Sequence, residues 1–196
     1  MTEHIRPTKD TLTGYLSRIT DTELAAELLR RVAGLEPNHP QHADTPRRFV
    51  SALKELTTPE EFKFTTFDTL HNEMIVQKDI PFVSLCQHHI LPFHGVAHVA
   101  YVPNTKMAGL SKLARCVRYH AASLQVQEDL TAEIAHDLDE QLEPRGVGVV
   151  MEAEHMCMTI RGVQVPGTRT YTACMKGVFG DHDKTAKAEF LSRINH

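Results

Sequence analysis

Two short segments, about 70 residues apart, concentrate side chains that bind metal ions or transfer protons at neutral pH. They are residues 86–89 (Cys-Gln-His-His) and residues 155–157 (His-Met-Cys). Cys86 and His89 are close enough in the chain to bind one ion, and Cys157 would be a third ligand. A Cys/Cys/His set that leaves the fourth position to water is typical of a catalytic zinc site, whereas structural zinc sites close all four positions. Thiolate and imidazole ligands together favour zinc over magnesium or calcium.

Two further histidines lie beside these candidate ligands. His88 is adjacent to His89, and His155 is two residues from Cys157. Both are placed to act as acid and base around a metal-bound water. The alternative is a chance cluster, because the chain has 13 histidines and Cys157 is of a residue type that is often buried and inert. The spacing alone leaves both interpretations open.

Composition excludes several classes of protein. The chain has 196 residues, 41% of them hydrophobic, and a net charge of −4 with neutral histidines. It has no cluster of basic residues, so we expect no nucleic-acid partner. It has no apolar run of the roughly twenty residues that a membrane helix needs. The start of the sequence has no apolar signal core, so we expect a cytoplasmic protein whose four cysteines are thiols or ligands rather than disulfides.

The hydrophobic pattern changes along the chain from helical to strand-like and back. Asp21 is expected to cap a first helix that ends at Gly34, and Asp44 a second helix with Pro46 in its first turn. The later elements are strands at 73–86 and 96–102, helices at 110–124 and 126–142, strands at 147–160 and 168–179, and a short C-terminal helix near 190–194.

This order of elements predicts an α+β fold with an antiparallel sheet and helices on one face. We expect a catalytic domain at 61–196, preceded by a helical extension at 1–60 of which residues 1–19 form a loose arm. The candidate metal ligands fall near the ends of two different strands. A sheet can bring such ends together, which favours a shared ion.

A group of cations falls at expected helix starts, where the helix dipole disfavours them unless an anion binds. Ser111, Lys112 and Arg115 lie in the opening turn of the helix at 110–124, with Ser111 as a possible cap. Arg161 follows the Cys157 segment, and Arg48 lies near the start of the second helix. The functional interpretation is a phosphate site. The alternative is an ordinary solvated basic surface.

Gln127 and Glu128 lie at the junction of the two long helices. An acidic residue near a helix start is favourable for dipole reasons alone. The functional alternative is recognition of a planar base, because a carboxylate accepts from two adjacent N–H donors and an amide both donates and accepts.

These residues occur in ordered motifs that resemble the GTP cyclohydrolase I family over roughly residues 21–194. The motifs are SLCQHH at 84–89, PFHG at 92–95, HVAYVP at 98–103, GLSKLAR at 109–115, LQVQE at 124–128, HMCM at 155–158, RGV at 161–163, TYT at 170–172 and GVF at 177–179, with DTPRR at 44–48. So many motifs in one order are highly specific for that family.

The resemblance implies a zinc enzyme with the tunnelling fold (T-fold), an antiparallel sheet backed by two antiparallel helices. It implies a homodecamer of two pentamers with active sites between subunits. The implied reaction opens the imidazole ring of GTP by hydrolysis, releases formate and gives 7,8-dihydroneopterin triphosphate. The implied roles are zinc binding by Cys86, His89 and Cys157, proton transfer by His88 and His155, guanine binding by Gln127 and Glu128, and triphosphate binding by Ser111, Lys112, Arg115, Arg161 and Arg48.

The chain departs from the family pattern at three positions. Gln87 stands where the family usually has glutamate, which removes a negative charge beside the expected metal. Ser123 and Asp129 stand where arginines are common. These changes suggest a specialised paralogue with the same first reaction. The alternative is a non-catalytic or altered-substrate paralogue that binds purine nucleotides, but the retained cysteines and histidines speak against it.

Overall fold

The computed structural model describes residues 14, 17–36, 38–180 and 184–195. Most of the arm expected at residues 1–19 lies outside these residues. The chain divides into two compact units, Met1–Glu55 and Leu56–His196, and each is described by itself. Among the described residues, the helices are all too short or too polar to cross a membrane.

The helix α2 (Asp21–Ala33) of the N-terminal unit begins one residue earlier than the sequence suggested. Its N-cap is Thr20, and Asp21 is the first helical residue. Thr20 Oγ1 accepts from the backbone N–H of Glu23 at 3.2 Å, and the Glu23 carboxylate accepts from the backbone N–H of Thr20 at 2.7 Å. This reciprocal pair satisfies two donors that a helix start leaves free. Gly34 ends the helix with a left-handed backbone, φ 69°.

The second helix, α3 (Thr45–Thr57), follows Asp44 as expected, with Pro46 in its first turn. The Asp44 carboxylate lies 3.4 Å from Arg47 Nη2 and 3.5 Å from Arg48 Nη2. Both arginines are well exposed, so these ion pairs contribute little to stability. They nevertheless give the two cations at this helix start a nearby negative charge.

The C-terminal unit contains a five-stranded sheet in the order β5-β2-β3-β6-β7. Its members are β2 (Ile75–Cys86), β3 (Pro92–Val102), β5 (Leu124–Gln125), β6 (Gly146–His155) and β7 (Thr170–Gly177). The expectation of a purely antiparallel sheet was wrong at one edge, where the two-residue β5 pairs parallel to β2. The sequence also missed a small separate sheet, in which β1 (Thr66–Asp68) pairs with β4 (Lys106–Ala108).

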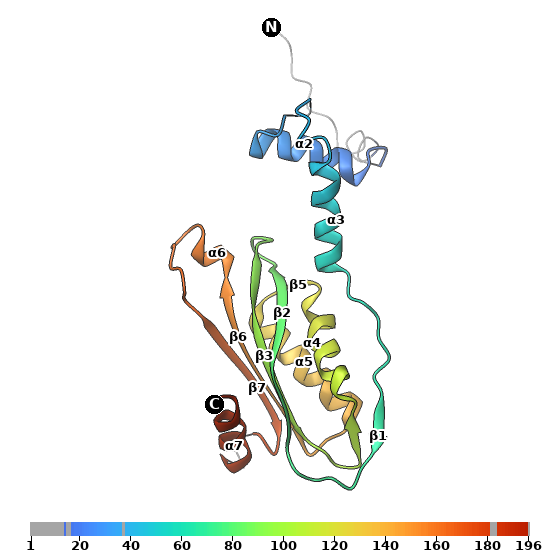
Figure 1. Cartoon of the computed structure of the whole chain (residues 1–196), viewed down its shortest axis with the longest axis vertical. Helices are drawn as coiled ribbons and strands as arrows, with labels where there is room; N and C mark the ends of the chain where they lie inside the picture. Colours follow the sequence, from blue (N-terminus) through green and yellow to red (C-terminus); the bar gives the residue numbers. More distant parts are fainter. Residues whose placement is uncertain (1–13, 15–16, 37, 181–183, 196) are drawn as a thin grey trace. The chain divides into compact units, whose positions relative to one another are not determined.

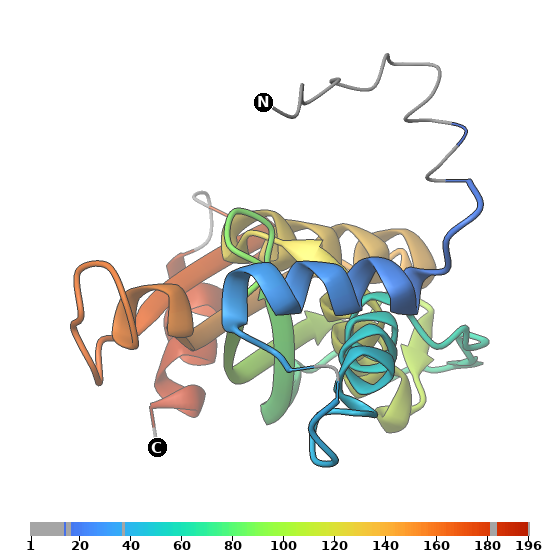
Figure 2. The ribbon, with the colours of Figure 1, turned by 90° about the horizontal axis from the view of Figure 1, so that it is seen from above.

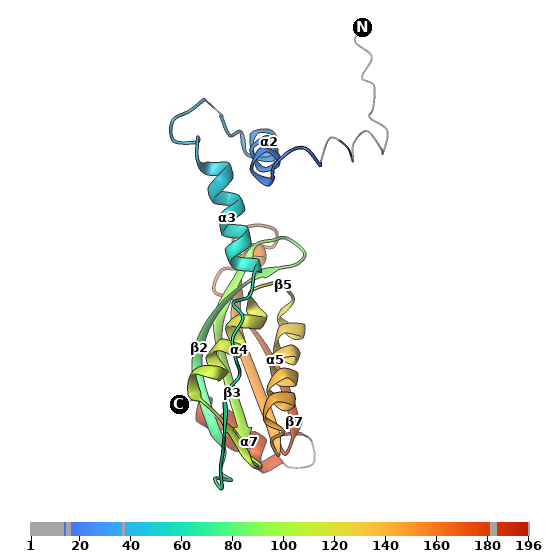
Figure 3. The same cartoon turned by 90° about the vertical axis from the view of Figure 1, so that its right-hand side faces the viewer.

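Two helices cover one face of this sheet, as the sequence predicted. α4 (Leu110–Ala121) packs on β2, and α5 (Gln127–Leu142) packs on β6 and β7 (Figure 3). α4 ends three residues before the expected boundary because residues 124–125 form β5. Alternate residues of the strands point into the core beneath the helices. These include Phe93, Ala97, Val99 and Tyr101 of β3, and Val147, Val149, Met151 and Ala153 of β6.

The opposite face of the sheet is partly covered, which the sequence did not predict. The C-terminal helix α7 (Lys184–Ile194) places Phe190 in a second core with Phe179 and with Ala100 and Val150 of the sheet. Figure 2 shows α5 and α7 on opposite sides of the sheet. α7 and the short helix α6 (Met156–Thr159) lie toward opposite ends of the strands (Figure 1). The continuous strand expected at 147–160 therefore ends at His155, and Cys157 is helical.

A β-bulge in β2 decides which residues of that strand face the helices. The pairing with β3 shifts by one residue between Gln77 and Ile80, and Asp79 has a positive φ of 58°. Ile75 faces the helix-covered core before the bulge, and Ile80, Phe82 and Cys86 face it afterwards. Since side chains alternate along a strand, only the extra residue lets both halves contribute to one core.

His98 holds the bulge from the neighbouring strand. Its Nδ1 accepts from the backbone N–H of Asp79 at 3.2 Å, a donor that the disrupted ladder leaves free. The His98 side chain is almost completely buried. Burial lowers the pKa of His98 below its ordinary value, and the carboxylates of Asp79 and Glu152 oppose that shift only in part.

We expect His98 to make the protein less stable in mild acid. Because its pKa is lower in the folded chain, the unfolded chain binds the proton more tightly. Its contribution is therefore complete above about pH 6.5 and is lost as the pH falls through the folded pKa. His98→Gln keeps an acceptor but cannot take up the proton. Urea denaturation between about pH 7 and pH 5 should show a shallower loss of unfolding free energy in this variant. Equal pH dependence in both proteins would contradict the role of His98, and His94→Gln on the same strand is the control.

Candidate functional site

The turn between β2 and β3 presents one half of the candidate site. Cys86 is the last residue of β2, and its carbonyl accepts from the backbone N–H groups of His89 at 3.2 Å and Ile90 at 2.7 Å. These bonds fold residues 86–90 into a tight turn that directs both histidine side chains back to the cysteine. Cys86 Sγ lies 3.8 Å from His88 Nδ1 and 3.9 Å from His89 Nδ1.

Ile90 has a left-handed backbone, φ 53°, at the end of this turn. A β-branched residue adopts that conformation at a cost of order 1 kcal/mol or more, and such strain concentrates at functional sites. The side chain of Ile90 is half exposed, so its own packing does not account for the conformation. The hydrogen bonds of the turn hold it in place.

The second half of the site comes from the end of β6. Phe93 pairs with His155 across the β3–β6 ladder, so the start of β3 and the end of β6 lie side by side. α6 follows at once and carries Cys157 in its first turn. One ligand atom each from Cys86, His89 and Cys157 lie within 4.8 Å of one another. The structure thus brings together the three residues that the sequence proposed as metal ligands.

The protonation of Cys157 depends on burial and on its charged neighbours. Burial raises the pKa of the Cys157 thiol, and the neighbouring Cys86 raises it further. The guanidinium of Arg161 acts in the opposite direction, which places this expected phosphate ligand within electrostatic range of the cluster. A bound cation stabilises the thiolate form of both cysteines, because the thiolate is the form that coordinates a metal.

His155 is held rigidly beside this cluster. Its ring stacks on Phe93 with the ring planes 2° apart and the centroids 4.7 Å apart. Its Nε2 lies 2.8 Å from Gln127 Oε1. A carbonyl oxygen only accepts, so Nε2 carries the proton and Nδ1 is the nitrogen left to exchange one. Burial lowers the pKa of His155, while the carboxylate of Glu128 opposes that shift.

Gln127 connects the start of α5 to the sheet. Its buried amide nitrogen donates to the carbonyls of Met151 at 3.2 Å and Thr170 at 3.0 Å, and lies 3.1 Å from Thr172 Oγ1. With the bond to His155, both the nitrogen and the oxygen of this amide are hydrogen-bonded within the protein. The expected role of Gln127 in binding guanine stays a prediction, whereas its contact with His155 is direct.

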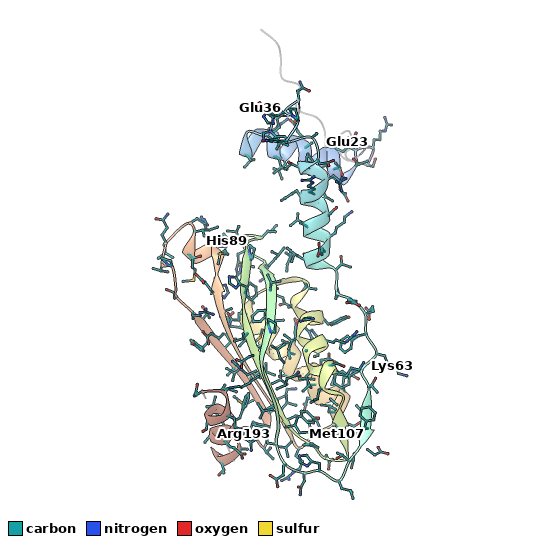
Figure 4. The ribbon with its side chains drawn as sticks, in the orientation of Figure 1. Glu23, Glu36, Lys63, His89, Met107 and Arg193 are labelled. Atoms are coloured by element: carbon teal, nitrogen blue, oxygen red, sulfur yellow. The ribbon has the colours of Figure 1, made fainter. Side chains whose placement is uncertain are left out.

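The expected phosphate ligands divide into separate groups. The start of α4 lies beside Ala108, whose backbone N–H donates to the hydroxyl of Tyr101 near the end of β3. The end of α4 leads into β5, which pairs with β2 at Cys86. Residues 111–115 in the opening turns of α4 therefore lie at the opposite end of the sheet from the cysteines. Figure 4 shows the same separation between His89 and Met107. Gly109 is the N-cap of α4, so the expectation that Ser111 caps this helix was wrong. Arg48 lies in the N-terminal unit.

Sequence reasoning missed two of the residues that shape this site. In the sequence, Phe93 stands out only as part of a motif. Its position opposite His155 in the sheet is what identifies it as a residue of the site. Thr172 belongs to a strand whose alternating pattern is visible in the sequence. Its hydroxyl contacts two residues of α5 that lie 41 and 45 positions earlier in the chain, and a local pattern does not predict such contacts.

Replacing Cys157 should remove a metal ion from this cluster. Cys157→Ala leaves only two of the three ligands. Loss of a residue that hydrogen-bonds to a metal ligand lowers metal affinity by roughly 10–100-fold, and loss of the ligand itself should lower it further. Metal content per chain, measured by plasma mass spectrometry after dialysis, should drop by about one ion. Cys174→Ala is the matched control, because Cys174 is also a partly buried free thiol but lies outside the cluster. Equal metal content in the two variants would contradict the assignment.

Known proteins resemble this chain over most of its length. The family model described as GTP cyclohydrolase I matches residues 22–195. GTP cyclohydrolase 1 of Synechococcus sp. (strain JA-3-3Ab) is 49% identical over 178 residues, which cover 88% of this chain and 77% of that protein. GTP cyclohydrolase 1 of Geobacillus kaustophilus (strain HTA426) is 47% identical over 178 residues, covering 88% of this chain and 94% of that protein.

One solved structure, the apo form of the archaeosine synthase QueF-Like, aligns with 53% of this chain and 93% of its own, with 14% identity and a TM-score of 0.43. That similarity is too low to support an argument. The family model and the relatives agree with each other. The chain belongs to the GTP cyclohydrolase I family.

Proposed function

We propose that this protein is a GTP cyclohydrolase I that opens the imidazole ring of GTP, releases formate and forms 7,8-dihydroneopterin triphosphate. The observation that carries the proposal is the meeting of Cys86, His89 and Cys157 beside a histidine whose proton position is set by Gln127, in a chain of this family. The relatives that support it are named for this activity.

The donor set of the cluster fits zinc. Two thiolates and one imidazole are soft and borderline ligands, and three protein ligands leave one position for water or substrate. Cys86, His89 and Cys157 would hold the ion. When bound, zinc supplies a Lewis acid that lowers the pKa of water and polarises a carbonyl group. The cluster therefore suits the two hydrolytic steps that ring opening and formate release require.

His155 and His88 are the groups that move protons. His155 donates its Nε2–H to Gln127, so Nδ1 is free to take up and return a proton as the guanine ring opens. Stacking on Phe93 prevents the ring from turning away. His88 Nδ1 lies 3.8 Å from Cys86 Sγ, which keeps a second imidazole next to the metal ligands. Gln127 is proposed as a positioning residue for His155, because its amide is occupied by contacts within the protein.

Glu128 is the proposed contact for the guanine edge. It is exposed in the first turn of α5 and close enough to His155 to oppose the lowering of that histidine's pKa by burial. Its carboxylate can accept from the two adjacent N–H donors of guanine.

Gln87 is exposed in the turn, and its backbone N–H donates to the carbonyl of Gln125 at 3.0 Å. This contact is independent of the side chain, so the turn tolerates glutamine at position 87.

The triphosphate site is proposed to combine two subunits. Arg161 lies on the same end of the sheet as the cysteines, but residues 111–115 lie at the other end of the same chain. A site that uses Ser111, Lys112 and Arg115 together with the zinc cluster therefore needs a second copy, and Arg48 is assigned to the same task. We infer a symmetric oligomer of T-fold subunits, in which residues 61–196 form the catalytic domain of a cytoplasmic homodecamer.

GTP turnover by the zinc-loaded protein tests the proposed reaction. Formate release and the fluorescence of the oxidised pterin product should appear together, and Cys157→Ala should abolish both because ring opening requires the metal site. Formate without pterin would identify a paralogue with an altered product. Neither signal with zinc bound would overturn the proposal in favour of a nucleotide-binding paralogue.

Mixed oligomers test whether the sites are shared. Lys112→Ala and Cys157→Ala should each be inactive alone. If equal amounts of the two variants are unfolded, refolded together and assemble at random, about a quarter of the sites combine an intact zinc cluster with an intact Lys112. The mixture should regain that share of wild-type activity. His89→Ala mixed with Cys157→Ala is the control and should stay inactive, because both changes damage the cluster of one chain. Equal activity of the two mixtures would contradict shared sites.

A further inference from the structure

A second group of metal-binding side chains lies between α4 and α5, outside the site described above. Cys116 and His120 are four residues apart on α4, so they project from the same side of the helix. Asp137 approaches them from α5. One ligand atom from each of the three residues lies within 4.8 Å of the others. The two helices pack side by side (Figure 3), which fixes this arrangement.

The distances suit a tetrahedral ion. Asp137 Oδ2 lies 3.4 Å from Cys116 Sγ and 3.0 Å from His120 Nε2. Ligands at zinc bond lengths of about 2.3 Å for sulfur and 2.0 Å for nitrogen or oxygen are themselves about 3.3–3.5 Å apart. Hydrogen bonds to a carboxylate have similar lengths, so the surroundings must distinguish the two cases.

The surroundings have the features of an outer layer around metal ligands. Glu133 Oε2 lies 3.6 Å from His120 Nδ1, the nitrogen that faces away from Asp137. Gln125 donates to the same Glu133 oxygen at 2.7 Å and holds it there. Gln141 donates to Asp137 Oδ1 at 3.3 Å, the carboxylate oxygen that faces away from the cysteine. A histidine that binds a metal almost always has a carboxylate or carbonyl on its other nitrogen, and its carboxylate partners are hydrogen-bonded in turn.

Asp137 places one side of the cluster against a pocket of about 250 Å³. Asp137, Tyr119 and Gln141 line it from the two helices, and Glu61, Phe62 and Phe64 line it from the segment before β1. Cys116 itself is completely buried. An ion can therefore enter at the carboxylate and keep a water ligand in the pocket while the thiol closes the protein side.

We propose that Cys116, His120 and Asp137 form a second binding site for a divalent cation of the zinc class. Binding replaces the thiol proton of Cys116, which leaves to solvent, by a sulfur–metal bond. The ion would join α4 to α5, and α5 begins with the Gln127 that orients His155. The site has no part in the reaction proposed above, so turnover of GTP and occupancy of this site can be tested separately.

The double variant Cys86→Ala/Cys157→Ala isolates the second site. It removes both thiols of the first cluster, and Cys116 and Cys174 are then the only cysteines left in the chain. Tag-free protein is stripped with chelator and titrated with Co²⁺ alone. We expect about one ion per chain with a thiolate-to-cobalt charge-transfer band in the near ultraviolet. Adding Cys116→Ala should abolish the band, and adding Cys174→Ala should leave it.

Histidine variants in the same background give a second readout. His120→Gln should abolish binding of the ion. His136→Gln should not, although His136 also lies beside a carboxylate on α5, with Nε2 3.3 Å from Glu140. If His120→Gln fails to fold, Asp137→Asn takes its place. In that case Zn²⁺ should raise the melting temperature of the background protein but not of the Asp137→Asn protein. A background protein that binds no ion, or equal binding after His120→Gln and His136→Gln, would overturn the proposal.

Discussion

The antiparallel pairing of β3 with β6 is the contact on which the candidate site depends. β3 follows the turn that carries His88 and His89, and β6 leads directly into the helix that carries Cys157. The register from Phe93 opposite His155 to Val102 opposite Gly146 makes these two ends meet. A slip by two residues would separate them by about 7 Å, far more than a metal–ligand bond, and a slip by one would turn His155 to the other face.

A small buried polar network supports that register from the helix side. Gln127 bonds to β6 through Met151, to β7 through Thr170, and to His155 at the site. Thr131, one turn later on α5, shares the Thr172 hydroxyl at 2.6 Å. Buried polar groups are favourable only when they are hydrogen-bonded, so α5 has one position along the sheet at which these contacts are all made. The same contacts orient the proposed proton carrier, so structure and chemistry depend on one side chain.

Much of this arrangement follows from local patterns. The sequence predicts the helix at 126–142 from apolar residues that recur every four positions, and the strand leading to Cys86 from a period near two. Both patterns depend only on residues that are close in the chain. Thr20 could have been identified as the cap from its spacing to Glu23. Long-range pairing was less accessible: the two-residue β5 has no periodic signal, and the contact of Asp137 with Cys116 and His120 joins two helices. The helical state of Cys157 was hidden because Met156 to Thr159 form only one turn.

The bulge in β2 has a consequence for how this chain can change in length. Gln77 and Ile80 face the same side of the sheet although their positions differ by three, and that odd step sets the direction of every side chain up to Cys86. Losing or gaining one residue in this stretch would direct the Cys86 side chain to the face where α7 packs. The thiol would then lie away from His89 and Cys157. The cluster therefore depends on the number of residues from position 77 to position 86 as well as on the thiol of Cys86.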